Sequence, residues 1–381
     1  MIVHRLYPVD PRVARAVRVA LESGYEVDVI ALRRRGEQAV ELVEGARVHR
    51  LPVTHHWGAG LPRTAFEYLG FTALATIRVA SLMLRRRYRV VHVNNPPDFL
   101  IVAALFPKLL GARVIFDVHD LSSDMFSMRF EGRVGSRTID RVLRFLERAA
   151  AHAADAVITV HEPYRQELIR RGVSAEKTDV VMNSVDEVLL AKAQPRPRDK
   201  TFRVVYHGTI TPHYGVHLLV EAVAQVVDEI KNVRLELYGE GDSIPAIAAR
   251  AKELDISARV HLSWGALPQK DVLEMVSSAN VGVIPNIASQ LNRFALSSKL
   301  FEYIVLGVPV IAAELPTIRA HFGDEELLFF PSGDAHALAR AIVMTAEDPG
   351  AAVRRADAAR RRYEQYRWPV YAQRYARILT G

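Results

Sequence analysis

The chain has 381 residues, of which 50% are hydrophobic and 24% charged, a composition typical of a globular protein. This length allows two domains with separate cores. The sequence contains no cysteine, which excludes disulfide frameworks, thiolate metal sites and cysteine nucleophiles. The first residues lack the apolar core of a signal peptide, so a cytoplasmic location is the default expectation.

The formal net charge is +7 and the isoelectric point is about 9.6. Basic runs occur at residues 33–35 and at Arg85, Arg86 and Arg87. Such runs can bind nucleic acid, meet an anionic membrane surface or only keep a protein in solution. Interleaved aromatic residues and nucleic-acid-binding motifs are missing, so we expect no nucleic-acid partner. A membrane surface and a solvated face remain open alternatives.

The opening of the chain predicts a β-α-β unit. A short apolar start is followed by Asp10 and Pro11, which predict the beginning of an amphipathic helix that runs to Leu21. Residues 26–32 then predict a strand. The first strand of this unit looks unusually short.

Residues 66–84 form the longest apolar-rich helical stretch, but polar residues interrupt it too often for a membrane span, which needs roughly 20 apolar residues. The stretch ends in Arg85, Arg86 and Arg87, a pattern typical of a helix that lies in a membrane interface. A helix buried in the first domain, with basic residues at its carboxyl end, explains the pattern equally well.

Residues 90–93 and 113–118 predict two buried strands of a parallel sheet, and His119 and Asp120 directly follow the second strand. Ligands of open α/β sheets bind beyond the carboxyl ends of the strands. His119 and Asp120 are therefore candidate active-site residues. Asp124 is a weaker candidate, because it can equally cap the following segment.

The second half of the chain begins after a polar, proline-containing segment at residues 191–200, which predicts a linker. Residues 202–206 predict a strand, and the loop of residues 207–215 leads from it into a helix. A strand, a glycine-containing loop and a helix start together form a phosphate cradle, here around Gly208. The next predicted strand, residues 233–238, leads into Gly239.

Residues 297–311 predict a helix that opens with Ser297 and Ser298, followed by a short strand. The free N–H groups and the dipole of a helix start favour a phosphate, and Lys299 adds a full charge. Glu302 lies on the same face as Lys299 and suits the paired hydroxyls of a ribose. An ordinary capped helix with a surface Lys-Glu pair is the alternative.

The segment Lys-Leu-Phe-Glu-Tyr, followed by Gly-x-Pro-Val-Ile, resembles the signature of the GT-B glycosyltransferases of family 4, which retain anomeric configuration. The resemblance covers most of the chain and implies an α/β fold with two doubly wound (Rossmann-like) domains facing a cleft. It implies an acceptor-side domain at residues 1–190, a linker at 191–200 and a nucleotide-sugar-binding domain at 201–365. The last helix, within residues 366–381, is expected to pack back on the first domain.

The resemblance also implies roles for individual residues. In that family the positions matching Glu302, Ser298 and Lys299 hold the donor ribose and diphosphate, and a histidine matching His119 contacts the donor sugar. Trp264 lies in the segment that cradles the nucleobase, where it either stacks on the base or belongs to the core. We therefore expect catalytic roles for His119, Asp120 and Lys299, and donor-binding roles for Gly208, Thr209, His213, Tyr214, Gly239, Trp264, Ser297, Ser298, Lys299 and Glu302.

Three positions depart from the family pattern. Phe294 stands eight residues before Glu302, where many members have a second glutamate in contact with the donor sugar. Thr209 and Tyr214 replace an arginine and a lysine of the phosphate loop. We expect His213, Lys299 and backbone N–H groups to share the neutralisation of the diphosphate.

The implied reaction moves a sugar from a nucleoside diphosphate sugar, such as a UDP-sugar, to a hydroxyl acceptor with retention. The expected acceptor is a glycan or lipid-linked glycan of bacterial cell-surface polysaccharide synthesis, which would place the protein at the inner face of the membrane. No Asp-x-Asp pair occurs, so we expect no metal and no cofactor besides the donor. The alternatives are a sugar-nucleotide 2-epimerase and a non-catalytic nucleotide-sugar-binding subunit.

Overall fold

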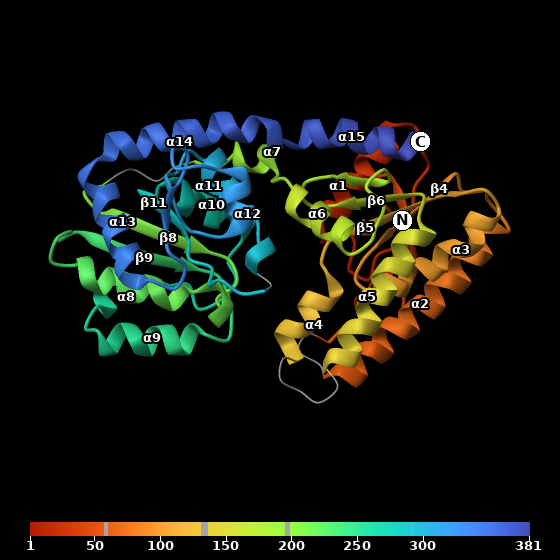
Figure 1. The fold of residues 1–381 in the computed structure, drawn as a ribbon, viewed down its shortest axis with the longest axis horizontal. Coiled ribbons are helices and arrows are strands. Elements are labelled where there is room, and N and C mark those ends of the chain that lie inside the picture. Colours follow the sequence, from red (N-terminus) through yellow and green to blue (C-terminus); the bar gives the residue numbers. More distant parts are fainter. Residues whose placement is uncertain (57–59, 131–135, 195–198, 291) are drawn as a thin grey trace. The chain divides into compact units, whose positions relative to one another are not determined.

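The computed structural model describes residues 1–56, 60–130, 136–194, 199–290 and 292–381. They fold into two compact units (Figure 1). Unit 1 consists of residues 1–183 and 368–381, and unit 2 consists of residues 184–367.

The sheet of unit 1 has two groups of strands. The strand order is β2-β3-β1 in one group and β4-β5-β6-β7 in the other, and all pairs are parallel except the pair of β2 with β3. The bounds are β1 (Asp28–Leu32), β2 (Val40–Val43), β3 (Ala46–Leu51), β4 (Val90–Asn94), β5 (Arg113–Val118), β6 (Ala156–Thr159) and β7 (Thr178–Val180).

Ile2 joins the two groups of strands, because it bridges Ile30 of β1 on one side and Val93 of β4 on the other. Its N–H donates to the carbonyl of His92 (2.8 Å), and its own carbonyl accepts from the N–H of Asn94 (3.0 Å). One residue therefore takes the place of the first strand, which explains why that strand looked so short in the sequence.

Two helices from opposite ends of the chain cover one face of this sheet. They are α1 (Pro11–Glu22), which Asp10 caps by accepting the N–H of Arg12 (3.0 Å), and α15 (Trp368–Thr380). The two helices pack together and share an apolar core with β1 and β3, to which Val17, Val29 and Tyr375 belong. The last helix is therefore part of unit 1.

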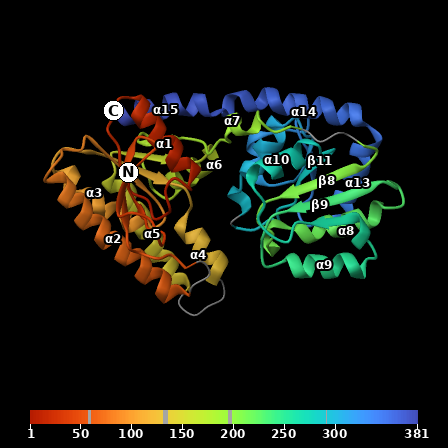
Figure 2. The ribbon, with the colours of Figure 1, turned by 180° about the vertical axis from the view of Figure 1, so that it is seen from behind.

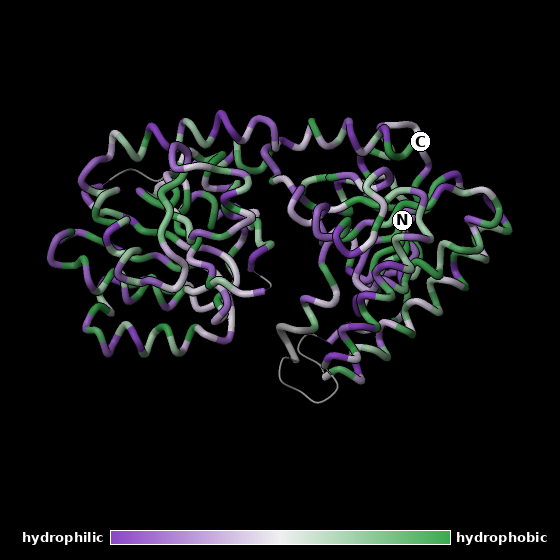
Figure 3. The backbone as a smooth tube through the Cα atoms, in the orientation of Figure 1, coloured by the Kyte–Doolittle hydropathy of each residue, from purple (hydrophilic) through white to green (hydrophobic). Residues whose placement is uncertain are grey.

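The remaining helices of unit 1 include α2 (Leu61–Met83), which packs against α3 and β3, while α3 and α5 pack on the central strands. None of the helices in the described ranges is long and apolar enough to cross a membrane. Figure 3 shows hydrophobic and hydrophilic residues mixed along α2. The other bounds are η1 (Asp98–Ile101), α3 (Val102–Leu109), α4 (Ser122–Phe130), α5 (Ser136–Ala153) and α6 (Glu162–Arg170).

A buried guanidinium holds three of these helices together. Arg171, directly after α6, donates to Ser123 (2.9 Å) and Asp124 (3.0 Å) of α4 and to Glu147 (3.1 Å) of α5. Its Nε also donates to Glu167 of α6 (2.7 Å). Asp124, the weaker site candidate of the sequence analysis, thus forms an ion pair that joins helices.

Unit 2 has a six-stranded parallel sheet with the order β10-β9-β8-β11-β12-β13. The chain winds outward in both directions from the centre of this sheet, so the predicted doubly wound fold is confirmed. The strands are β8 (Phe202–His207), β9 (Val233–Tyr238), β10 (Val260–Leu262), β11 (Val281–Ile284), β12 (Val310–Ala313) and β13 (Leu328–Phe330).

Helices cover this sheet as well. Figure 2 shows α8 between β9 and α9, and α13 packs against α8 and β12. α10 packs against β8, and α11 packs against β11 and β12 as well as against α14 and α7. The bounds are α7 (Glu187–Leu190), η2 (Pro212–Tyr214), α8 (Val216–Val226), α9 (Ile244–Glu253), η3 (Ser257–Arg259), α10 (Gln269–Ser277), η4 (Asn292–Phe294), α11 (Ser298–Val305), α12 (Pro316–His321), α13 (Ala335–Glu347), α14 (Pro349–Tyr363) and η5 (Glu364–Tyr366).

The chain passes from unit 1 to unit 2 between Asn183 and Ser184, ahead of the segment predicted as the linker. The reason is that Ser184 bonds Tyr363 through their hydroxyls (2.9 Å) and Arg367 pairs with Glu187 (2.7 Å), which ties residues 184–190 to unit 2. Residues 195–198 of the expected linker lie outside the described residues.

Candidate functional site

In unit 2 the loops that follow β8 and β9 touch backbone to backbone. A Cβ added to Gly239 would lie 1.9 Å from the carbonyl oxygen of Gly208, and the φ of Gly239 is +149°. A side chain at this position would force the two loops apart. The two predicted glycines are therefore brought together at the carboxyl end of the sheet, where ligands of such folds bind.

The side chain of Lys299 reaches this place from α11. Its Nζ donates to the hydroxyl of Tyr206 (2.9 Å), which in turn donates to the carbonyl of Thr209 (2.6 Å). The ammonium lies 4.3 Å and 4.8 Å from the ring centroids of Tyr206 and Tyr214, within cation–π range. A Cβ on Gly208 would lie 3.2 Å from Nζ. The loop residues Gly208 and Tyr214 thus lie against Lys299, and Thr209 is linked to it through the hydroxyl of Tyr206.

Burial shifts the protonation of this cluster. It lowers the pKa of Lys299 to about 8, against the opposing effect of Glu302, and it raises the pKa of Glu302 to about 7, against the effect of Lys299. Between these values Lys299 is a cation and Glu302 is an anion. A buried cation with little solvation of its own is well suited to hold an anionic ligand.

His207, which the sequence analysis did not single out, lies beside Glu302. Its Nε2 is 3.2 Å from a carboxylate oxygen of Glu302, although the two groups are not aligned as a hydrogen bond. Burial, and then the charge of Lys299, lower the pKa of His207 to about 3. A neutral imidazole therefore borders Glu302 at physiological pH.

The start of α11 matches the prediction, since the helix begins at Ser298 with Ser297 as its N-cap residue. The hydroxyl of Ser297 makes no capping hydrogen bond, and Ser298 is exposed. The hydroxyl of Ser297 is thus not used for capping, and the first N–H groups of an α-helix have no partner within the helix, so this helix start is suited to an anion.

Trp264 does not belong to the core, because its side chain is 65% exposed. This corrects the alternative in which it packs inside the domain. Its φ of +54° lies in the left-handed region, a strained conformation for a bulky residue. The hydroxyl of the preceding Ser263 accepts the N–H of Gly239 (3.0 Å), which fixes the Trp264 loop beside the glycine loops.

Two further predicted positions lie near these loops. His213 is exposed, and its carbonyl accepts from the side chain of Asn292 (2.8 Å). Phe294 is half-buried, with the guanidinium of Arg293 4.4 Å above its ring. The roles expected of both positions remain predictions.

In unit 1, His119 and Asp120 follow β5 as expected, and Asn95 orders the turn. The side-chain oxygen of Asn95 accepts the N–H of His119 (2.7 Å) and of Asp120 (3.3 Å), and its amide donates to the carbonyl of Asp120 (2.7 Å). His119 is 4% exposed and Asp120 is half-buried.

Asp117 is a member of this group that the sequence analysis did not name. It lies 2.8 Å from Nε2 of His119 and 3.3 Å from Nε2 of His92, whose Nδ1 is 2.6 Å from the hydroxyl of Tyr375. Burial acts to raise the pKa of Asp117, but His119 and His92 hold it well below its usual range. A signal was present in the sequence, because Asp117, near the end of β5, and His119, directly after β5, are two residues apart, the spacing at which side chains of an extended chain point to the same side.

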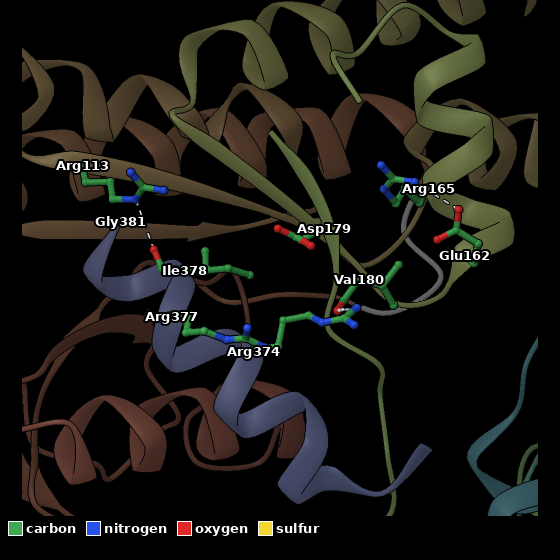
Figure 4. Close-up of a pocket in the computed structure, with 9 residues that line it drawn as sticks. All are labelled: Arg113, Glu162, Arg165, Asp179, Val180, Arg374, Arg377, Ile378 and Gly381. Atoms are coloured by element: carbon green, nitrogen blue, oxygen red, sulfur yellow. Dashed lines mark hydrogen bonds and ion pairs between the residues drawn. The ribbon is translucent and has the colours of Figure 1, made fainter. Parts of the chain in front are cut away.

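One pocket of about 540 Å³ lies elsewhere in unit 1, beside β7 and α15 (Figure 4). Four arginines and two acidic residues line it: Arg113, Arg165, Arg374, Arg377, Glu162 and Asp179. Arg113 and Arg374 donate to the carbonyls of Ile378 and Val180, so these cations contribute to packing. None of the predicted site residues lines this pocket.

In the described parts of the chain, no group of three or more histidine, aspartate or glutamate side chains is placed to hold a metal ion. The expectation that the reaction needs no metal stays a prediction.

Two family models match the chain. The "Glycosyl transferase 4-like domain" matches residues 9–184, and "Glycosyl transferases group 1" matches residues 201–348.

Similar proteins are found in a plant and in a mycobacterium. One subunit of the phosphatidylinositol N-acetylglucosaminyltransferase of Arabidopsis thaliana is 24% identical over 68% of this chain and 55% of its own length. The α-maltose-1-phosphate synthase of Mycolicibacterium smegmatis is 27% identical over 62% of this chain and 66% of its own length. The chain thus spans between half and two thirds of these two relatives.

Solved structures share the fold over the whole chain. The sucrose-phosphate synthase of Thermosynechococcus elongatus superposes with a TM-score of 0.76 at 20% identity, covering 100% of this chain and 94% of that one. The Anabaena protein HepE, solved in complex with UDP, superposes with a TM-score of 0.71 at 16% identity. The superposition covers 100% of this chain and 98% of HepE.

The two units, the matched family models and the similar structures together define the GT-B class of glycosyltransferases. The chain belongs to the GT-B glycosyltransferases of the family 4 and group 1 type.

Proposed function

We propose that this chain transfers a sugar from a UDP-sugar to a hydroxyl acceptor, with retention of configuration and without a metal. The observation that carries the proposal is the buried ammonium of Lys299, held against Gly208 and beside the start of α11. A diphosphate placed there would receive a full positive charge, helix N–H groups and the hydroxyls of Ser297 and Ser298. UDP as the nucleotide is supported by its presence in the Anabaena HepE structure.

In this mechanism the bond between the anomeric carbon and the diphosphate oxygen breaks while the acceptor oxygen bonds to the same face of that carbon. The acceptor proton passes to the leaving diphosphate, so no covalent intermediate with the protein forms. Lys299 and the helix start stabilise the charge that develops on the leaving group. Glu302 accepts hydrogen bonds from the ribose, Trp264 stacks on the base, and His119 orients the donor sugar.

The test is thermal unfolding with UDP, GDP, ADP and dTDP. A ligand at about a hundred times its Kd stabilises a protein by about 2.7 kcal/mol, so binding is readily seen. We expect UDP to stabilise the wild type, and Lys299→Met and Glu302→Gln to lose most of this effect. Lys270→Met is the matched control, since Lys270 is 68% exposed on α10.

If no nucleotide stabilises the wild type, the proposal is wrong. The phosphate loop that carries Thr209 and Tyr214 then does not bind a nucleotide-sugar donor. If UDP binds but purified protein fails to hydrolyse or transfer any UDP-sugar, the non-catalytic binding subunit is the better interpretation. A product in which the sugar has been epimerised at C2 without transfer would instead indicate the epimerase.

We further propose that the acceptor is a lipid-linked glycan used in bacterial cell-surface polysaccharide synthesis, and that unit 1 binds the cytoplasmic face of the membrane. Exposed apolar residues form one stripe along α2: Phe66, Leu69, Ile77 and, just beyond its end, Leu84. At 100° per residue these positions fall on one side of the helix. On α3, which packs against α2, Val102, Phe106 and Leu109 are exposed as well.

The basic run lies next to this surface. Arg85, Arg86 and Arg87 are exposed directly after α2, and Arg86 pairs with Glu26 (3.0 Å). An apolar surface with cations at its edge fits an anionic bilayer, to which each basic residue contributes about 1 kcal/mol. These features favour the interfacial interpretation of α2 over the alternative of a helix buried in the first domain.

Flotation with phosphatidylglycerol-containing vesicles tests this surface. The combined Arg85→Ser, Arg86→Ser and Arg87→Ser variant should lose most of the vesicle-bound protein, and so should Phe66→Ser with Ile77→Ser. The control replaces the equally exposed Arg33, Arg34 and Arg35 by serine. Equal flotation of all variants, or equal binding to pure phosphatidylcholine, would show that this surface does not meet an anionic membrane.

A further inference from the structure

Unit 1 contains an apolar pocket of about 210 Å³ between α2, α4 and α5, which we call the α2/α4/α5 pocket. Its lining includes Leu61 and Tyr68 of α2, Phe99 of η1, Met125 of α4, and Leu143 and Leu146 of α5. Pockets that enclose whole drug-sized ligands hold about 300–1,000 Å³. The space is therefore suited to part of a larger molecule, and its apolar walls suit a hydrocarbon group.

The pocket adjoins the loop of His119 and Asp120. Asn95, which orders that loop, donates from the same amide to Asp98 (2.8 Å) and to the carbonyl of Asp120 (2.7 Å). Asp98 belongs to the pocket wall, and so does Ser122, two residues after Asp120. A molecule in the pocket would therefore lie next to the residues expected to act on the donor sugar.

The walls of the pocket are fixed by buried interactions. The guanidinium of Arg171 binds Ser123 and Asp124 of α4 and Glu147 of α5, and Arg171 is 8% exposed. Arg171 thereby links α4, which contributes Met125 to the pocket, to α5, which contributes Leu143 and Leu146. A pocket with fixed walls is present before its ligand arrives, which avoids a cost of ordering on binding.

Apolar residues continue from the pocket to the surface. On α2, the exposed Leu69 follows the lining residue Ala65 by four residues, and on α5 the exposed Val142 precedes the lining Leu146 by four. Residues four apart on a helix are neighbours. Leu69 is also part of the exposed stripe proposed to meet the membrane, so one apolar surface runs from that stripe to the pocket.

We infer that the α2/α4/α5 pocket binds a hydrocarbon segment of the glycosyl acceptor, so that the acceptor lipid is held by its chain while its polar end lies near His119. A hydrocarbon segment matches the apolar lining of the pocket. It also matches the apolar surface that connects the pocket with the exposed stripe of α2. Asp98 is the acidic group in the wall, and an acceptor hydroxyl could donate to it. This inference rests on the proposed function, whose acceptor it describes more closely.

Binding of 1-hexanol, 1-octanol and 1-decanol to the whole chain, measured by isothermal titration calorimetry, tests the inference without any need for activity. Affinity should rise with chain length for the wild type. Leu143→Trp and, from the opposite wall, Ala65→Trp fill the pocket and should weaken decanol binding at least tenfold. Phe145→Trp, at a position of α5 that is 67% exposed and does not line the pocket, is the control and should leave decanol binding unchanged.

UDP binding is measured on the same samples, because it reports on unit 2 and on the proposed function separately. Decanol binding lost in both filled variants, with UDP binding kept, supports the pocket. If the wild type binds UDP but no alkanol, or if the filled variants bind decanol as the wild type does, the pocket inference fails while the proposed function stands. Alkanol binding without UDP binding would reject the proposed function and, with it, the acceptor as the occupant, while the pocket would still be a hydrocarbon-binding site.

Discussion

Asp117 lies 2.8 Å from Nε2 of His119, and the same carboxylate lies 3.3 Å from His92. The carboxylate is held ionised by its two histidine neighbours. It therefore orients the ring of His119 and balances any positive charge that the ring carries during the reaction. In the proposed reaction Asp117 is a positioning residue that acts through His119.

Asp117→Asn should lower the rate of sugar transfer roughly tenfold, or about 1.4 kcal/mol in activation free energy, and should change its pH profile. UDP affinity should stay the same, since UDP is expected to bind in unit 2. The measurement is kcat against pH, with the exposed Asp179→Asn as control. An unchanged kcat and pH profile would show that His119 needs no partner for its role.

The pH dependence of UDP binding follows from Lys299 and Glu302. Lys299 loses its proton as the pH rises through about 8, and Glu302 gains one as the pH falls through about 7. We therefore expect the highest affinity between pH 7 and 8. Above pH 8 it should fall by up to roughly tenfold per pH unit, as one proton is lost.

Titration calorimetry across this range checks the expectation, and Lys299→Met should abolish the alkaline fall. An affinity that stays constant from pH 7 to 10 in the wild type would contradict a role for the Lys299 ammonium.

Gly239→Ala should disturb the contact between the two loops, because the new methyl group would meet the carbonyl of Gly208. We expect a loss of about 1–3 kcal/mol in unfolding free energy, typical of overpacking, and weaker UDP binding. Gly265→Ala is a close control, since a Cβ there meets nothing within 4 Å. Chemical denaturation and UDP titration of both variants are the measurements. Equal behaviour of the two variants would mean that the loops adapt.

Arg171→Met should destabilise unit 1 by about 3–5 kcal/mol at neutral pH, because Asp124 and Glu147 would be left buried without their cation. Arg170→Met is the control: Arg170 also pairs with Glu167 but is 66% exposed. Urea denaturation followed in unit 1 measures the difference. If both variants lose equally little, the buried network does not hold the helices.

The same network has a pH signature. Burial raises the pKa of Glu147 to about 7, so the stability that its protonation adds is complete below the unfolded value of about 4.5 and is lost as the pH rises through 7. The Arg171→Met variant should therefore recover part of its loss at pH 5.5. A deficit that is the same at pH 5.5 and pH 8 would exclude Glu147 as its cause.

The sequence was sufficient for features that depend on local order. The start of α11, the strand β12 and the end of β5 at His119 lie where periodicity and turn residues placed them. It did not indicate β2 and β3, nor the contact of Lys299 with Tyr206, which are 93 positions apart. The pairing of His92 with Asp117 depends on the register of β4 and β5, which no single strand encodes. Whether Trp264 is exposed likewise depends on whether other segments of the folded chain pack over its side chain.

Because α15 belongs to unit 1 while the intervening residues 184–367 form unit 2, the first unit is assembled from both ends of the chain. During synthesis, residues 184–367 have all left the ribosome before Tyr375 and Leu379 can reach the core that they share with α1. Unit 2 is thus able to finish folding first, against the usual order from the N-terminus. Until then the face of α1 that later packs against α15 stays uncovered. This face is an apolar surface to which a chaperone would bind.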